Sequence, residues 1–177
     1  MTLQLWGRPS SARTQKVMLA LSELNLTYEF IKASATMGPK GSVSRGKTPY
    51  GIVNTTEYLE KNPNGTIPTI NDEGFVLWES NAIVQYLGMK YNPKLFYDAN
   101  IETFASASRW MMWENNQLIP PMHDLAKHLY RLPENQRDEN VVRTSKEKLF
   151  LEFQKVEVQL SKTRFISGDQ WLSLIHI

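Results

Sequence analysis

The sequence predicts an α/β domain with a four-stranded mixed sheet, followed by an all-α domain. Two observations support this fold class. About the first 90 residues alternate β-rich segments with helical periodicity in the order β-α-β-α-β-β-α, whereas only helical periodicity continues beyond residue 100. The length of 177 residues is also sufficient for two small domains. We expect one domain over residues 1–91, a linker over residues 92–100, and an all-α domain over residues 101–177.

A strand, a helix and a second strand open the chain. Thr2–Trp6 alternates apolar and polar residues, which predicts a short strand. Ala12–Asn25 carries apolar residues at helical spacing, and Thr27–Ile31 is rich in β-forming residues. The crossover through the helix predicts that the two strands are parallel. Residues 33–55 are rich in Gly, Ser, Thr, Pro and Lys, which predicts a long irregular loop.

A hairpin and a helix complete the predicted sheet domain. After a short helix at Thr56–Lys61, we expect two strands, Thr66–Asn71 and Phe75–Trp78, on either side of a tight turn. Ser80–Tyr91 then has the apolar spacing of an amphipathic helix. The two closing strands bring the predicted sheet to four.

Helical patterns fill the second half of the chain. Ile101–Leu118 is aromatic-rich and helical, and we expect Pro120 and Pro121 to break this helix. Met122–Leu132 is a second helical piece, and residues 134–163 form a long amphipathic helix.

The composition excludes several kinds of chemistry. The chain has no cysteine, which excludes a disulfide scaffold, a thiolate metal site and a thiol nucleophile of its own. The net charge of +2 gives no reason to expect nucleic-acid binding, and the three histidines lack metal-ligand spacing, so we expect no metal. Neither a targeting signal nor a membrane-spanning run is visible, so we expect a cytoplasmic protein without membrane contact.

A proline follows the start of a predicted strand in the segment Asn62–Pro68. Proline is unexpected there unless it lies at an edge or in a special turn. A cis Ile67–Pro68 bond would leave the N–H and C=O of Ile67 free for a ligand, although only about 5–6% of X–Pro bonds are cis.

Glu79 and Ser80 lie at a strand-to-helix junction. We expect Ser80 to cap the helix, whose unpaired N–H groups can bind a carboxylate. Glu79 would supply a counter-charge for an ammonium group, so the pair suits the α-amino-acid end of a zwitterion. The alternative is an ordinary serine cap with an acidic neighbour.

A third pattern lies at the start of the first predicted helix, where Ser10, Ser11 and Arg13 follow the first strand. A helix N-terminus carries a partial positive charge, and hydroxyls and a guanidinium added to it form a site for a thiolate or an oxyanion. The alternative is again a simple cap.

Together, the three patterns resemble the cytosolic glutathione S-transferase family over about residues 2–170. The resemblance implies a thioredoxin-like domain followed by an all-α domain, with glutathione as co-substrate and no metal. The position four residues after Gly7 is Ser11, which resembles the serine-type classes (theta, phi and the bacterial nu type). In such enzymes this hydroxyl stabilises the glutathione thiolate; Ser10 is the neighbouring alternative, and we expect Arg13 to assist.

The resemblance also implies the binding residues. Ile67 would pair through its backbone with the cysteinyl part of glutathione, beside Thr66 and a cis Pro68. Glu79 and Ser80 would hold the γ-glutamyl end.

The sequence departs from the family pattern in two places. Serine-type relatives often carry His-Lys where Val53 and Asn54 stand here, so we expect the basic loop to reach the glycyl carboxylate through Lys40, Arg45 or Lys47. Family members continue beyond Asp169 with a Ser/Thr-x-Ala-Asp motif and a buried helix. Here residues 170–177 end in an apolar run, which favours a truncated or artefactual end and an incomplete all-α domain.

The leading prediction is a homodimeric, detoxifying transferase that conjugates glutathione to a small hydrophobic electrophile. We assign Trp110 and Trp113 to the second-substrate pocket, although their helical spacing is also typical of core residues. One alternative is glutathione-dependent reduction of a peroxide or disulfide, and another is a non-catalytic binding or regulatory protein with the same fold. Cysteine-type chemistry is excluded because the chain has no cysteine.

Overall fold

The structure is a computed structural model that describes residues 2–34, 51–94 and 100–169. Its sheet has the strand order β2-β1-β3-β4. β1 (Leu3–Gly7) pairs in parallel with β2 (Tyr28–Lys32), as the crossover predicted. β3 (Thr69–Asp72) is antiparallel to both β1 and β4 (Phe75–Trp78). The predicted four-stranded mixed sheet is therefore confirmed.

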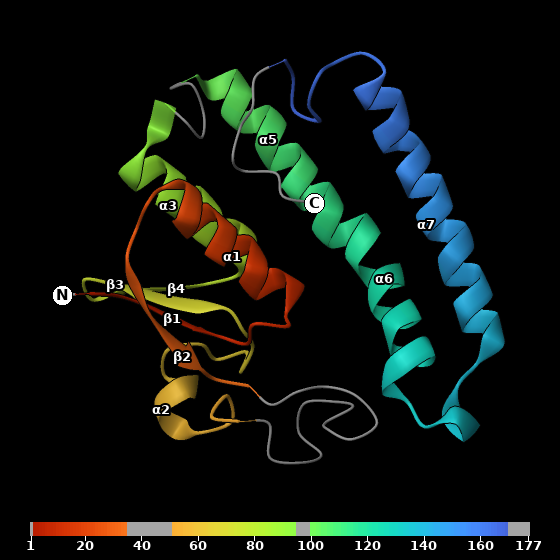
Figure 1. Cartoon of the computed structure of the whole chain (residues 1–177), viewed down its shortest axis with the longest axis horizontal. Coiled ribbons are helices and arrows are strands. Elements are labelled where there is room, and N and C mark those ends of the chain that lie inside the picture. Colours follow the sequence, from red (N-terminus) through yellow and green to blue (C-terminus); the bar gives the residue numbers. More distant parts are fainter. Residues whose placement is uncertain (1, 35–50, 95–99, 170–177) are drawn as a thin grey trace.

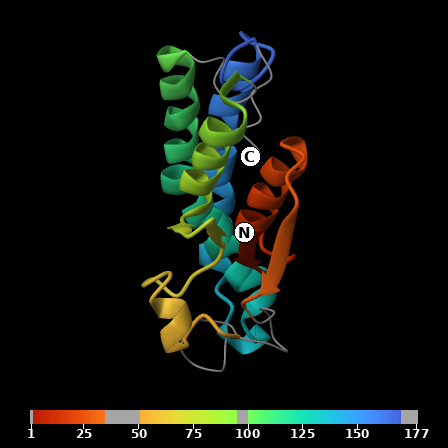
Figure 2. The ribbon, with the colours of Figure 1, turned by 90° about the vertical axis from the view of Figure 1, so that its left-hand side faces the viewer.

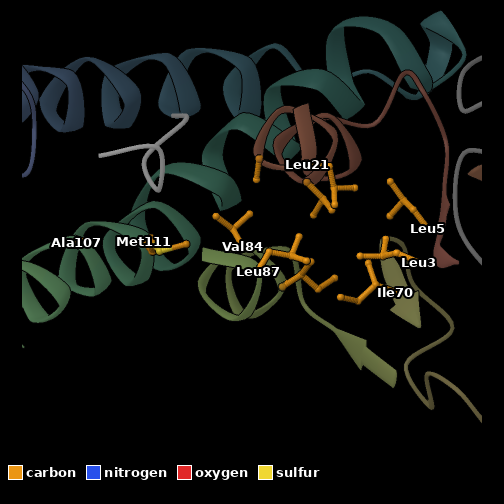
Figure 3. Packing of buried hydrophobic residues seen from close by; sticks show 11 residues of the cluster. Leu3, Leu5, Leu21, Ile70, Val84, Leu87, Ala107 and Met111 are labelled. Atoms are coloured by element: carbon orange, nitrogen blue, oxygen red, sulfur yellow. The ribbon is translucent and has the colours of Figure 1, made fainter. Parts of the chain in front are cut away.

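Two helices cover one face of this sheet. α1 (Ala12–Glu23) and α3 (Ser80–Tyr91) pack together, and Figure 1 shows both between the sheet and α5. Figure 3 shows the resulting core, in which side chains of the sheet meet those of α1 and α3. Its fully buried members from these elements are Leu5, Val17, Ala20, Leu21, Ile70, Ile83, Val84 and Leu87.

The opposite face of the sheet carries a smaller core next to the short helix α2 (Thr56–Leu59). Trp6 belongs to this cluster, whereas its neighbour Leu5 belongs to the larger one, because successive side chains of a strand point to opposite faces. Tyr58 of α2 and Val53 complete the small cluster together with Ala33.

The hairpin and the following helix agree closely with the sequence prediction. β4 and α3 have the predicted bounds, and Glu73 and Gly74 form the turn before β4. β3 begins at Thr69 rather than at Thr66, since Pro68 has no N–H to donate to the ladder.

The prediction that two prolines break the first long helix was wrong. α5 (Ile101–Trp113) continues through a π turn at Glu114–Leu118 directly into α6 (Ile119–Ala126). The prolines fall in the first turn of α6, where a missing N–H costs little. The π turn shifts the hydrogen-bond register ahead of them.

The remaining helical segment returns along α5 and α6. A second π turn (Lys127–Arg131) and a 3₁₀ turn (Glu134–Gln136) lead to α7 (Glu139–Leu160), whose N-terminus is capped by Asp138. Figures 1 and 2 show α7 running back beside α6 and the end of α5.

The helical layer also contributes to the main core. Ala107 and Met111 of α5 pack against the cluster formed by the sheet, α1 and α3, as Figure 3 shows. Residues 95–99 of the predicted linker lie outside the described residues, so the domain boundaries remain a prediction. Among the described helices, none combines the length and apolar character needed to cross a membrane.

Candidate active site

Three chain segments converge at one end of the sheet. The register aligns Trp6 of β1 with Thr69 of β3, and Thr69 with Trp78 of β4. β1 and β4 are parallel to each other because each is antiparallel to β3. Three segments therefore meet at this end of the sheet: the residues after Trp6, the residues after Trp78 and the residues before Thr69. They contain the three patterns that the sequence analysis singled out.

Ser11 lies at the N-terminus of α1, and its hydroxyl oxygen accepts a hydrogen bond from the Thr14 N–H at 3.4 Å. This capping bond uses an oxygen lone pair and leaves the hydroxyl proton available for donation. The strand end and the helix approach closely here, since a Cβ on Gly7 would lie 2.4 Å from Cγ2 of Thr14. Glycine at this position lets the helix begin directly beside the end of β1.

Ser10 has a different environment. It is exposed, and its hydroxyl accepts a hydrogen bond from Nε of Arg8 at 3.1 Å. The buried Arg8 side chain also donates from Nη1 to the Ser34 hydroxyl at 3.1 Å. Of the two candidate hydroxyls, only that of Ser11 caps α1.

The start of α3 differs from the prediction that Ser80 caps it. Glu79 occupies the cap position and makes no side-chain capping bond, whereas Ser80 is the first helical residue and is 3% exposed. Glu79 has φ 72°, a left-handed backbone conformation that residues other than glycine rarely adopt. Such backbone strain is often found at functional sites.

Arg13 connects this cap to α1 and to the helical layer. Its Nη1 lies 3.6 Å from Oε2 of Glu79, and both side chains are partly exposed. Its Nη2 donates to Oδ1 of Asn115 at 3.0 Å, in the π turn that follows α5. The guanidinium therefore lies between the two helix N-termini.

The third segment contains a cis Ile67–Pro68 bond, as predicted. Two side chains hold Thr66, the residue before Ile67. Its carbonyl accepts from Nδ2 of the buried Asn62 at 2.9 Å and from the Tyr58 hydroxyl at 2.6 Å. Burial raises the pKa of Tyr58, although hydrogen bonds to Thr69 and Asn62 oppose this shift, so the hydroxyl stays protonated as a donor at neutral pH.

A buried charged network lies behind the site. Nζ of Lys16 donates to Oε2 of Glu114 at 2.6 Å and to Oδ1 of Asn81 at 2.8 Å. Nδ2 of Asn81 in turn donates to Oε2 of Glu114 at 3.1 Å and to the Met111 carbonyl at 2.9 Å. Three elements, α1, α3 and the π turn after α5, thus share one closed set of hydrogen bonds.

Comparison with known proteins identifies the family. Residues 5–95 match the family described as "Glutathione S-transferase, N-terminal domain". The chain is 33% identical over 171 residues to the glutathione S-transferase GstB of Escherichia coli K12. This match covers 96% of the chain and 76% of GstB. This chain belongs to the glutathione S-transferase family.

Solved structures agree with the assignment to the glutathione S-transferases. A theta class glutathione S-transferase from Xanthomonas axonopodis pv. citri, crystallised with glutathione bound, superposes with a TM-score of 0.84 at 28% identity. The match covers 98% of this chain and 78% of that one. Glutathione transferase F7 of Populus trichocarpa superposes with a TM-score of 0.79 at 25% identity, covering 97% of this chain and 77% of that one. The thioredoxin-like sheet domain and the helical region are thus those of a glutathione S-transferase.

Of the two tryptophans predicted for the second-substrate pocket of this glutathione S-transferase, Trp113 contacts α7 and Trp110 contacts Trp113. Nε1 of Trp113 donates to Glu152 of α7 at 2.8 Å, and the Trp110 ring meets the Trp113 ring edge-on at 5.3 Å between centroids. None of these contacts brings either indole beside Ser11, so their role in the second-substrate pocket remains a prediction.

The other predictions concern residues near or beyond the ends of the described ranges. Val53, which replaces the family's histidine, is fully buried, whereas Asn54 is exposed. Two further predictions fall outside the described residues. One concerns the loop residues predicted to bind the glycyl carboxylate, Lys40, Arg45 and Lys47, and the other concerns residues 170–177.

The sequence analysis missed the network around Lys16. The shortest bond of this network joins Lys16 to Glu114, which is 98 positions away, and no local pattern reveals such a pair. The available signal was a lysine on the buried face of α1, next to Val17 and four residues before Ala20. A lysine in such a stripe requires a buried partner.

Proposed function

We propose that this chain is a serine-type glutathione transferase, in which the Ser11 hydroxyl stabilises the glutathione thiolate for attack on a hydrophobic electrophile. One observation carries the proposal. The N-termini of α1 and α3 and the Ile67–Pro68 bond lie at the same end of the sheet, where Arg13 and Glu79 approach to 3.6 Å. This arrangement offers hydrogen-bond donors and charges of both signs to one small zwitterionic ligand.

The chemical task is to ionise a thiol. A free thiol has a pKa of about 8.5 and is only a few per cent thiolate at neutral pH. Lowering this pKa by about two units requires roughly 2.7 kcal/mol. A hydrogen bond from Ser11, the partial positive charge at the N-terminus of α1, and the guanidinium of Arg13 together suit this magnitude.

The binding of glutathione is assigned to the other two segments. The backbone of Ile67 precedes β3 and belongs to no strand pair, so it can bind the cysteinyl part of glutathione next to Thr66 and Pro68. At the start of α3, the Ser80 N–H suits the γ-glutamyl carboxylate and Glu79 suits its ammonium group.

Four further parts of the proposal rest on the resemblance to the family. The basic loop residues Lys40, Arg45 and Lys47 would bind the glycyl carboxylate in place of the missing His-Lys. The protein would act as a homodimer, and it would detoxify small electrophiles in the cytoplasm. Trp110 and Trp113 would border the second substrate.

Glutathione titration calorimetry followed by conjugation of a model aryl halide tests this function. The proposal expects binding of glutathione and its conjugation to the halide by this chain. Binding combined with turnover of an organic hydroperoxide but not of the halide would favour a glutathione-dependent reductase. Binding without turnover of either would indicate a non-catalytic protein, and no binding would remove the proposal.

A further inference from the structure

Glu114 is a buried residue of the helical layer whose carboxylate contacts both α1 and α3. Its carboxylate is buried, and one oxygen, Oε2, accepts from both Lys16 and Asn81. Lys16 and Asn81 are also bonded to each other, so the three side chains form a closed triangle. A shift of any one member would lengthen two hydrogen bonds at once.

The triangle connects the two helix N-termini that form the candidate site. Lys16 belongs to the second turn of α1, whose first turn begins after the Ser11 cap. Asn81 directly follows Ser80 in α3. Glu114 belongs to neither helix but to the π turn after α5, so it fixes both from outside.

The next residue of the π turn extends this connection. Asn115 accepts from Arg13, which in turn lies beside Glu79. Two consecutive residues of the helical layer therefore hold two cations of α1. The π turn therefore adds polar contacts to the direct packing of α1 against α3.

Buried ion pairs contribute little net stability compared with well-packed apolar side chains, because desolvating the charges offsets their attraction. Burial lowers the pKa of Lys16, and the adjacent carboxylate of Glu114 opposes this shift. The pair is thus a costly way to fill this space, but its hydrogen bonds define one geometry.

We propose that Glu114 is a positioning residue for the thiolate site, which sets the α1 N-terminus against the α3 N-terminus through Lys16 and Asn81. This inference rests on the proposed function. Glu114 acts through Lys16 and Asn81 rather than on glutathione directly.

The test measures the pKa of the bound glutathione thiol, from the ultraviolet absorbance of the thiolate against pH, together with kcat, KM and the melting temperature. Glu114→Gln retains the shape and removes the charge. The double variant Lys16→Met, Glu114→Leu replaces the pair with apolar side chains of similar size, so we expect it to stay folded even if the single variant is unstable. Glu147→Gln is the matched control, since Glu147 forms an exposed ion pair with Arg143 on α7.

In both Glu114 variants, the bound thiol pKa is expected to rise by about one unit, and kcat/KM measured below that pKa to fall about tenfold. The control should match the parent chain. A double variant with the parent's melting temperature, thiol pKa and kcat would overturn the inference and show a purely structural role. If the parent chain does not bind glutathione or does not ionise its thiol, the proposed function fails, and the inference fails with it.

Discussion

Arg13 and Glu79 approach to 3.6 Å, and this contact joins the first turn of α1 to the left-handed cap residue of α3. The two residues come from opposite ends of the sheet domain's sequence, yet they lie at the same end of its sheet. Because both side chains are partly exposed, their mutual attraction contributes only about 0–1 kcal/mol to folding. The contact therefore matters more for the charge distribution of the site than for stability.

Replacing Arg13 with alanine should reduce activity without unfolding the chain. The change removes a cation from the helix end that faces the thiolate in the proposed function, so we expect kcat/KM for conjugation to fall about tenfold. The free energy of unfolding, measured in urea, should change by less than about 1 kcal/mol. Arg143→Ala removes another partly paired arginine, far from the site on α7, and should leave kcat/KM unchanged. Equal activity of the two variants would contradict the role of Arg13.

Asn62 should be needed for the segment that precedes β3. Its buried amide donates to the carbonyl and hydroxyl of Thr66 and to the hydroxyl of Thr69. Asn62→Ala removes this donor and leaves the Tyr58 hydroxyl as the remaining side-chain partner of the Thr66 carbonyl and the Thr69 hydroxyl. We therefore expect a loss of about 1–3 kcal/mol in the free energy of unfolding and a higher KM for glutathione. Urea titration and steady-state kinetics measure both.

An exposed asparagine provides the control for this change. Asn140→Ala, at the start of α7, should alter stability by no more than about 0.5 kcal/mol. If Asn62→Ala were as stable as this control, the amide would not organise the segment.

Asp72 should make stability depend on pH in the acid range. Burial favours its neutral form, but hydrogen bonds from Lys90, Tyr91 and Tyr86 outweigh this and hold the pKa of Asp72 below its usual value. A depressed folded-state pKa contributes stability above the unfolded value of about 3.9, and this stability is lost as the pH falls through the folded-state pKa.

The variant Asp72→Asn tests this dependence. At pH 7 it should be less stable than the parent by about 1–3 kcal/mol, because charged hydrogen bonds are weakened. This difference should shrink in urea titrations as the pH falls below about 4. A difference that stays constant with pH would show that the Asp72 charge does not stabilise the fold.

The sheet domain was predictable because its signals are local. Asp72, Glu73 and Gly74 supply turn residues, and the helix that begins at Ser80 has a regular apolar face, so the elements on both sides of Glu79 were correctly bounded. The convergence of the three motifs follows from strand direction, which the crossover and the hairpin define.

The remaining features depend on non-local contacts. The prolines alone predict a helix break at Pro120. The preceding π turn, which shifts the hydrogen-bond register so that the helix continues, has no sequence signature. The cap of α3 is Glu79 rather than the predicted Ser80, and a glutamate in the sequence does not indicate a positive φ. The bond from Lys16 to Glu114 spans two domains of the predicted layout, so no periodicity could reveal it.

The central claim is that the Ser11 hydroxyl stabilises the glutathione thiolate. The most direct test compares kcat for Ser11→Ala with kcat for Ser10→Ala. The account predicts that Ser11→Ala lowers kcat for aryl halide conjugation by about 10–100-fold, the loss of one charge-assisted hydrogen bond, with little change in the affinity for glutathione. Ser10→Ala, which removes a neighbouring hydroxyl bonded to Arg8, should stay within about twofold of the parent. An unchanged kcat in Ser11→Ala would contradict the account, and a loss in Ser10→Ala instead would assign the thiolate to the other hydroxyl.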